Sequence, residues 1–118
     1  MLAIKDKGIL LNIEGHCERV LSKIDGLTKE SFLENDDAIE IVCFNILQIG
    51  ELVAHLDSDF TFQFNEQPWG QMTGMRNKIV HGYGSIDNET VWNTATLNIR
   101  PLLNYCKEIL RNNIKKEA

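Results

Sequence analysis

The stretch Asn35–Leu56, which reads NDDAIEIVCFNILQIGELVAHL, decides the fold class. Its apolar residues recur every three or four positions, which is the spacing of one face of an α-helix. That face consists of Ile39, Val42, Cys43, Ile46, Ile49, Gly50, Val53 and Leu56. The carboxylates of Asp36 and Asp37 suit a helix start, because they complement its partial positive charge. The stretch therefore predicts an amphipathic helix that begins near Asn35.

The same spacing predicts a helix on the N-terminal side, ending at Asp25–Gly26 because glycine tolerates the conformation of a helix C-terminus. Its apolar face consists of Leu10, Ile13, Cys17, Val20, Leu21 and Ile24. On the C-terminal side, Pro68 suits the first turn of a third helix that ends at Gly82 or Gly84. This helix carries the apolar residues Trp69, Met72, Met75, Ile79 and Val80.

A long fourth helix is predicted to start at Asp87, whose side chain caps it, and to continue through Leu110. Its apolar positions are Val91, Ala95, Ile99, Leu102, Cys106, Ile109 and Leu110. Pro101 falls inside this pattern and is expected to kink the helix, because proline removes one backbone hydrogen bond.

Two connecting segments carry further aromatic residues. Thr28 is predicted to cap a short turn that carries Phe32 and Leu33. Between residues 57 and 67 the phenylalanines alternate with polar residues, as in a strand, but a single strand without a partner is marginal. We expect a loop that tucks its aromatic side chains against the helices. The sequence thus predicts one all-α domain over residues 1–118, a bundle of four to five helices with a long, kinked C-terminal helix.

The charge balance limits the functional classes. Twelve basic residues against 17 acidic ones give a net charge of −5, which excludes a domain whose whole surface is a nucleic-acid footprint but allows a local basic patch. The three cysteines form no Cys-x-x-Cys pair, so we expect reduced, packed thiols. The sequence has no recognisable signal peptide, and no apolar run reaches the roughly 20 residues of a membrane span. A cytoplasmic location is expected.

The stretch MRNKIVHGY, residues 75–83, gathers the side chains suited to chemistry. Arg76 and His81 are five residues apart, about 140° around an ideal helix, so they do not face the same way. Asn77 and His81 share a face, as do Arg76 and Tyr83 if the helix continues past Gly82. Two copies of the helix meeting at a two-fold axis would bring Arg and His together more easily. The simpler alternative is that both side chains only cap the helix end.

Other candidates have structural interpretations. Glu51 and His55 share a helix face and suit two metal ligands, but no third ligand has matching spacing. Glu51 can instead pair with Arg76 or lie free on the surface. His16 is expected to be a hydrogen-bonded structural histidine, and the tryptophans 69 and 92 to be core or interface anchors rather than base-stacking platforms. The chain contains no glycine-rich nucleotide-binding motif.

The string Arg76-x4-His81-x-Tyr83, taken with Trp69 and Gly50–Glu51, resembles the pattern of HepT-like proteins, a branch of the HEPN superfamily of small helical domains. The similarity extends over essentially the whole chain. Further matching positions are Pro68, Gly74–Met75, Ile86–Asp87 and Val91–Trp92.

The resemblance implies a metal-independent ribonuclease that acts as a homodimer without a cofactor, the toxin of a two-gene module. Its implied partners are RNA and MntA, a minimal nucleotidyltransferase antitoxin. Arg76 and His81 then map onto the catalytic pair, Asn77 onto the variable polar position, and Tyr83 onto the tyrosine that the antitoxin modifies with AMP. Glu51 would support Arg76.

This sequence departs from the family pattern in two ways. Gly82 replaces a larger residue between the His and the Tyr, and the chain is acidic for an RNA-binding protein. Two other functions are therefore kept as alternatives. One is a catalytically silent HEPN module that binds RNA, a nucleotide or a nucleotidyltransferase. The other is a plain helical interaction domain.

Overall fold

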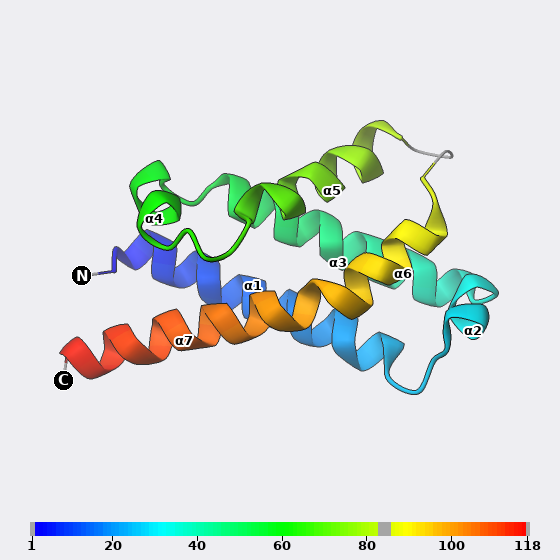
Figure 1. The fold of residues 1–118 in the computed structure, drawn as a ribbon, viewed down its shortest axis with the longest axis horizontal. Helices are drawn as coiled ribbons and strands as arrows, with labels where there is room; N and C mark the ends of the chain where they lie inside the picture. Colours follow the sequence, from blue (N-terminus) through cyan, green and yellow to red (C-terminus); the bar gives the residue numbers. More distant parts are fainter. Residues whose placement is uncertain (1, 83–85, 118) are drawn as a thin grey trace.

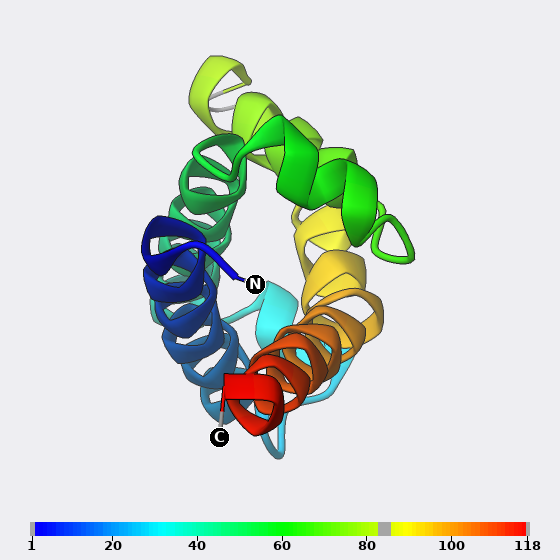
Figure 2. The same cartoon turned by 90° about the vertical axis from the view of Figure 1, so that its left-hand side faces the viewer.

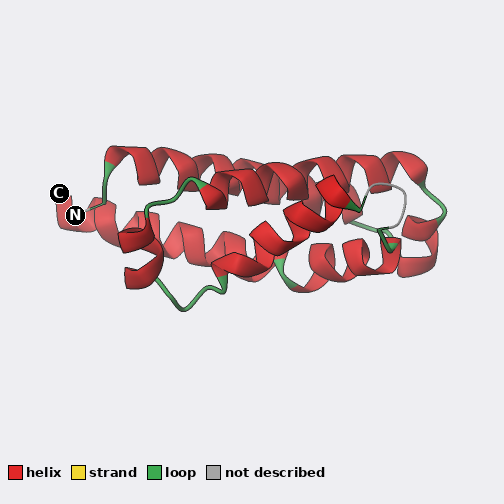
Figure 3. Cartoon of the chain, turned by 90° about the horizontal axis from the view of Figure 1, so that it is seen from above, coloured by secondary structure: helices red, strands yellow, loops and turns green. Residues whose placement is uncertain are grey.

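The computed structural model describes residues 2–82 and 86–117, with side chains up to residue 113. Within these parts the chain forms helices and no strand (Figure 3). The helices are α1 (Ile4–Ile24), α2 (Lys29–Leu33), α3 (Asp36–Ala54), α4 (Ser58–Gln63), α5 (Trp69–His81), α6 (Asn88–Leu97) and α7 (Ile99–Glu117). The predicted all-α class is confirmed. No helix in the described ranges is both long and apolar enough to cross a membrane.

The long helices lie roughly lengthwise in an elongated bundle of 47 × 29 × 19 Å (Figure 1). Viewed end-on, α1, α3, α5 and the α6–α7 pair surround a common interior (Figure 2). Their apolar faces fill this interior, as the sequence pattern predicts. Fully buried side chains include Leu10, Ile13, Cys17, Val20, Val42, Ile46, Ile49, Met72, Ile99, Leu102 and Cys106.

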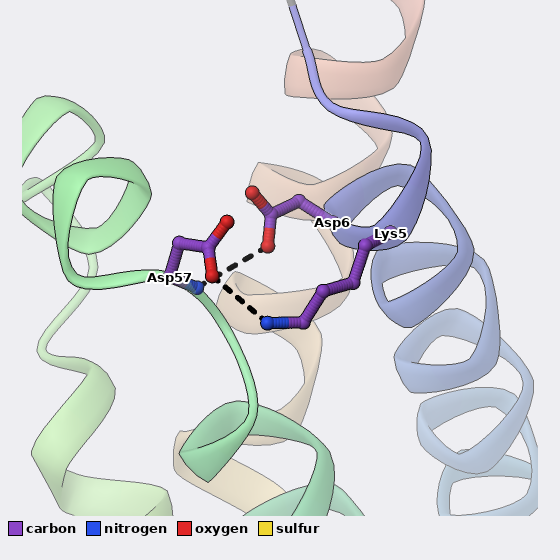
Figure 4. A network of polar contacts seen from close by, with 3 residues as sticks. All are labelled: Lys5, Asp6 and Asp57. Atoms are coloured by element: carbon purple, nitrogen blue, oxygen red, sulfur yellow. Dashed lines mark hydrogen bonds and ion pairs between the residues drawn. The ribbon is translucent and has the colours of Figure 1, made fainter.

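Polar contacts fix how α1 lies against α3 and α4. At one end, Lys5 Nζ donates to Asp57 Oδ1 at 2.8 Å, and the buried Asp6 carboxylate accepts the backbone N–H of Asp57 at 3.2 Å (Figure 4). The hydrogen bond from Lys5 to Asp57 raises the pKa of Lys5. Near the middle of α3, His16 Nδ1 lies 2.8 Å from Asn45 Oδ1. Because low numbers in α1 meet high numbers in α3, the two helices run antiparallel.

The predicted helix starts carry the expected caps. Asn35 Oδ1 accepts from the Ala38 N–H at 3.0 Å, and Asp87 Oδ1 accepts from the Glu89 N–H at 3.0 Å. Thr28 caps α2 with a full capping box, so the predicted short turn is a short helix. These side chains satisfy N–H groups that have no partner within their own helix.

The long C-terminal helix is divided in two rather than only kinked. α6 ends at Leu97, and α7 starts at Ile99 after the single residue Asn98. Pro101 has no N–H to donate to the Leu97 carbonyl, and its ring would clash with that carbonyl, so the helix ends there. This division and the two short helices α2 and α4 raise the described helices to seven, against the four or five predicted.

The predicted loop over residues 57–67 is wrong in part, because Ser58–Gln63 forms α4. Phe60 is buried and Phe64 half-buried, whereas Phe62 is 82% exposed. Phe60 and Phe64 are four residues apart and lie on one helix face, while Phe62 points to the other side. The aromatic side chains therefore pack with helical spacing, and one of the three does not tuck against the bundle.

Candidate functional site

Helix α5 positions the residues that the sequence singles out, and Trp69 fixes its N-terminal end. The indole is buried; its Nε1–H donates to the Phe64 carbonyl at 2.7 Å, and its ring packs against Phe60 and Tyr105. The expectation that Trp69 is a core anchor is confirmed. Pro68 occupies the N-cap position rather than the first turn.

Arg76 leaves α5 toward α3 and forms an ion pair there. Its Nε–H donates to Glu51 Oε1, and its Nη1 donates to Asn77 Oδ1 at 2.9 Å. The Arg76 and Glu51 side chains are 32% and 37% exposed. Of the alternatives for Glu51, the structure shows the pair with Arg76. The two bonds use two of the five guanidinium N–H groups, so the guanidinium group keeps donors for a negatively charged oxygen of a ligand.

His81 lies one turn beyond Arg76, in the last turn of α5, and its side chain is exposed. Asn77 is exposed as well. Within the described residues no hydrogen bond joins Arg76 to His81, which agrees with their predicted separation around the helix. The structure thus presents Arg76, Asn77 and His81 on the surface of the protomer rather than in a deep cavity.

The C-terminal end of α5 borders a small hollow. Gly82 is the C-cap, and its N–H donates to the Lys78 carbonyl at 2.8 Å, so the predicted helix end at Gly82 is confirmed. A hollow of about 280 Å³ beside it is lined by Lys78, Gly82, Ile86, Asp87 and Thr90. Tyr83 lies outside the described residues, and the structure gives no account of its place.

Two exposed apolar side chains follow the helix faces that carry Glu51 and Arg76. Phe44 of α3 is 58% exposed and, seven residues before Glu51, lies on the same helix face. Val80 is 40% exposed and lies one turn after Arg76. Val80 therefore lies at the exposed edge of the apolar positions of α5. We refer to Phe44 and Val80 as the outer apolar face.

His16 has the structural role expected of it, and its partner was not foreseen. Its Nδ1 lies 2.8 Å from Oδ1 of Asn45, a polar side chain that is buried in α3 and donates to the Ile41 carbonyl. Arg19 Nη1 approaches the same nitrogen at 3.2 Å. The signal was present in the sequence, since an asparagine within an apolar helix face needs a buried hydrogen-bond partner.

The remaining candidates, Trp92, His55 and the cysteines, have environments that fit structural roles. Trp92 packs against Phe32 with ring centroids 5.1 Å apart. His55 is the exposed C-cap of α3, and in the described part of the chain no three His, Cys, Asp or Glu side chains are grouped to hold a metal ion. Two of the three cysteines are buried, and burial raises the pKa of the Cys17 thiol to about 12 and raises that of the Cys106 thiol as well. These thiols are free but are packed as small apolar groups.

Comparison with known proteins gives consistent matches along most of the chain. Residues 13–109 match the model of a family described as "Ribonuclease HepT-like". A candidate RNase of Caldanaerobacter subterraneus subsp. tengcongensis is 28% identical over 102 residues, 86% of this chain and 91% of that protein. A candidate RNase of Methanocaldococcus jannaschii is 27% identical over 107 residues, 90% of this chain and 91% of that protein. A probable ribonuclease HepT of Thermococcus cleftensis is 30% identical over 83 residues, 67% of this chain and 76% of that protein. No solved structure matches the chain.

Proposed function

The chain belongs to the ribonuclease HepT-like family, and on that premise we propose that it is an endonuclease that cleaves RNA without a metal ion. The proposal rests on the positions of Arg76 and His81 on α5. Arg76 is held half-buried by Glu51 and Asn77, and His81 is exposed one turn away on the same helix. A guanidinium with donors to spare and an accessible imidazole are the two groups that the reaction needs.

RNA supplies its own nucleophile, the 2′-hydroxyl. In the proposed reaction an imidazole of His81 accepts the 2′-hydroxyl proton, and the 2′ oxygen attacks the adjacent phosphorus. The bond from phosphorus to the 5′ oxygen breaks, that oxygen takes up a proton from water, and the His81 imidazolium returns its proton to the solvent. The products are a 2′,3′-cyclic phosphate and a free 5′-hydroxyl. Arg76 binds the non-bridging phosphate oxygens and stabilises the negative charge that grows on them.

We propose that the active unit is a homodimer with α5 near the two-fold axis. Arg76 and His81 diverge on one helix and lie on an open surface, whereas catalytic sites are usually concave. By helix spacing Phe44 shares a face of α3 with Glu51, and Val80 follows Arg76 by one turn of α5, so a second copy that covers these exposed side chains would place the same residues of both chains around one groove.

We further propose that the protein is a toxin controlled by an MntA-like nucleotidyltransferase. Transfer of AMP from ATP to the Tyr83 hydroxyl would release pyrophosphate and add a phosphodiester charge two residues from His81. That charge would compete with RNA phosphate for Arg76 and silence the nuclease without unfolding it.

The test is RNA cleavage by the purified protein in excess EDTA. We expect a structured RNA to be cut with 2′,3′-cyclic phosphate ends, and the same RNA with a 2′-deoxy substitution at the cut position to stay intact there. Cleavage that stops with EDTA and returns with Mg²⁺ would contradict the mechanism. Binding without cleavage would instead support the silent HEPN module, which the net charge of −5 and the engagement of Arg76 by Glu51 favour.

A further inference from the structure

Gly50 lies where α3 and α5 touch most closely. A Cβ atom added to Gly50 would lie 2.7 Å from the Met72 carbonyl oxygen and 3.1 Å from Arg76 Cγ, and closer still to Arg76 Cβ. The carbonyl and the Cβ are fixed to the backbone of α5, so neither can swing aside. A side chain at position 50 would therefore force the two helices apart.

Local backbone geometry does not explain why position 50 holds a glycine. Gly26 is the one described glycine with a positive φ, so Gly50 is in a conformation that alanine adopts readily. Glycine also weakens a helix interior relative to alanine. Gly74, in α5, offers a contrast, since a Cβ there would meet nothing within 4 Å. Close contact with Arg76 and Met72 is what Gly50 provides.

Two consecutive residues of α3 thus hold both ends of the Arg76 side chain. Gly50 packs against the Cβ and Cγ atoms of Arg76, and Glu51 accepts the hydrogen bond from Nε of its guanidinium group. Nη1 then reaches beyond the pair to Asn77. A shift of α5 away from α3 would move the backbone and Cβ of Arg76, while Glu51 would stay in place. The direction of the guanidinium group would therefore change.

We infer that Gly50 and Glu51 are positioning residues for Arg76: the missing side chain of Gly50 sets the distance from α3 at which Arg76 emerges, and Glu51 sets the direction of its guanidinium. The inference rests on the proposed function insofar as Arg76 contacts the RNA phosphate. It predicts that Gly50→Ala reduces kcat, because a displacement of about 1 Å can slow a reaction by roughly 10²-fold. Since the substrate-binding surface remains, KM should change little.

The first measurement does not depend on catalysis. In a ¹H–¹⁵N spectrum, the Nε–H signal of Arg76 is identified by its absence in Arg76→Lys. We expect this proton to exchange slowly with water in the wild type and in the control Gly74→Ala, and fast in Gly50→Ala. If the Gly50→Ala signal keeps the wild-type exchange rate, the inference is wrong, whether or not the protein cleaves RNA.

The second measurement is kinetic. Gly50→Ala should lower kcat in the wild-type background and cause no further loss in an Arg76→Ala background, whereas Gly74→Ala should be neutral in both. An equal loss in both backgrounds would mean that Gly50 only supports the fold. If Gly50→Ala shows no cooperative melting transition, Glu51→Asp replaces it, because the shorter side chain should lose Nε–H protection and kcat together. Retention of both in Glu51→Asp would overturn the inference. A wild type that leaves RNA intact would refute the proposed function, while the exchange measurement still decides the role of Gly50.

Discussion

At the scale of single residues, Arg76 is restrained by contacts along its whole side chain. Its Cβ and Cγ atoms pack against Gly50 of α3, its Nε pairs with the Glu51 carboxylate, and its Nη1 donates to Asn77. Such restraint reduces the conformational freedom that a flexible arginine would lose on binding a phosphate. The same carboxylate repels an approaching phosphate, so the orientation of Arg76 comes with a local electrostatic cost.

The buried thiols give a test at this scale. Burial raises the pKa of Cys17 from 9.0 to about 12. At pH 8 we expect iodoacetamide to label Cys43, which is half-buried, and to leave Cys17 and Cys106 unlabelled, because only a thiolate in reach of solvent reacts. Peptide mass spectrometry measures this, and all three should be labelled in denaturant. Rapid native labelling of Cys17 would contradict the packing.

The raised pKa of Cys17 makes the stability of the fold depend on pH. Between pH 9.0 and about 12 the unfolded chain loses the Cys17 proton while the folded chain keeps it. The contribution to stability is therefore complete below pH 9 and is lost as the pH rises toward 12. Denaturant unfolding at increasing pH should show a steeper loss of stability in the wild type than in Cys17→Ala. Equal slopes would show that burial does not hold this thiol neutral.

At the scale of elements, side-chain caps mark where α2, α3 and α6 begin. Asn35 Oδ1 accepts the Ala38 N–H at the start of α3, the helix that carries Gly50 and Glu51. Asn35→Ala should lower the free energy of unfolding by about 1 kcal/mol, as measured by denaturant titration. Asn12→Ala, at an exposed position inside α1, is the control and should be neutral or slightly stabilising. A loss in both variants would mean that the cap is not the cause.

How far the sequence predicts these elements depends on their length. The residues of α1, α3 and α5 span several helical turns, so a repeat of three and four residues is unambiguous there. α4 has six residues, and within so short a window Phe60, Phe62 and Phe64 fit an alternating pattern as well as a helix. Tertiary packing of Phe60 and Phe64 against the bundle decides between the two.

The candidate site shows the same limit. Spacing within α5 correctly separates Arg76 from His81, because both belong to one helix. The contact of Gly50 with Arg76 joins residues 26 positions apart and depends on how closely α3 and α5 approach. The exposure of Val80 has a related reason: the edge of an apolar stripe can face the core or the outside, and neighbouring helices determine which.

At the scale of the whole molecule, the outer apolar face predicts association. Phe44→Glu should place a charge at the centre of the proposed interface and convert a dimer to a monomer in multi-angle light scattering at micromolar concentration. Phe62→Glu is the matched control, since Phe62 is 82% exposed on α4. If Phe44→Glu stays dimeric, or if the wild type is monomeric, the proposed dimer is wrong.

Control by a partner is a second prediction at this scale. Incubation with an MntA-like nucleotidyltransferase and ATP should add the mass of AMP to the wild type and nothing to Tyr83→Phe, as seen by intact-mass spectrometry. The modified protein should melt like the unmodified one and fail to cleave RNA. A mass gain that persists in Tyr83→Phe would refute the assignment of the tyrosine, and full activity of the modified protein would refute its inhibitory effect.

The central claim is that Arg76 and His81 carry out RNA cleavage, and the most direct test is the single-turnover cleavage rate of two alanine variants beside matched controls. Arg76→Ala should slow cleavage about 10²–10³-fold by removing charge stabilisation, and His81→Ala about 10²–10⁴-fold by removing proton transfer. Arg100→Ala and His55→Ala, which remove an exposed arginine and an exposed histidine on α7 and at the end of α3, should cleave at the wild-type rate. Wild-type rates in Arg76→Ala and His81→Ala would contradict the account.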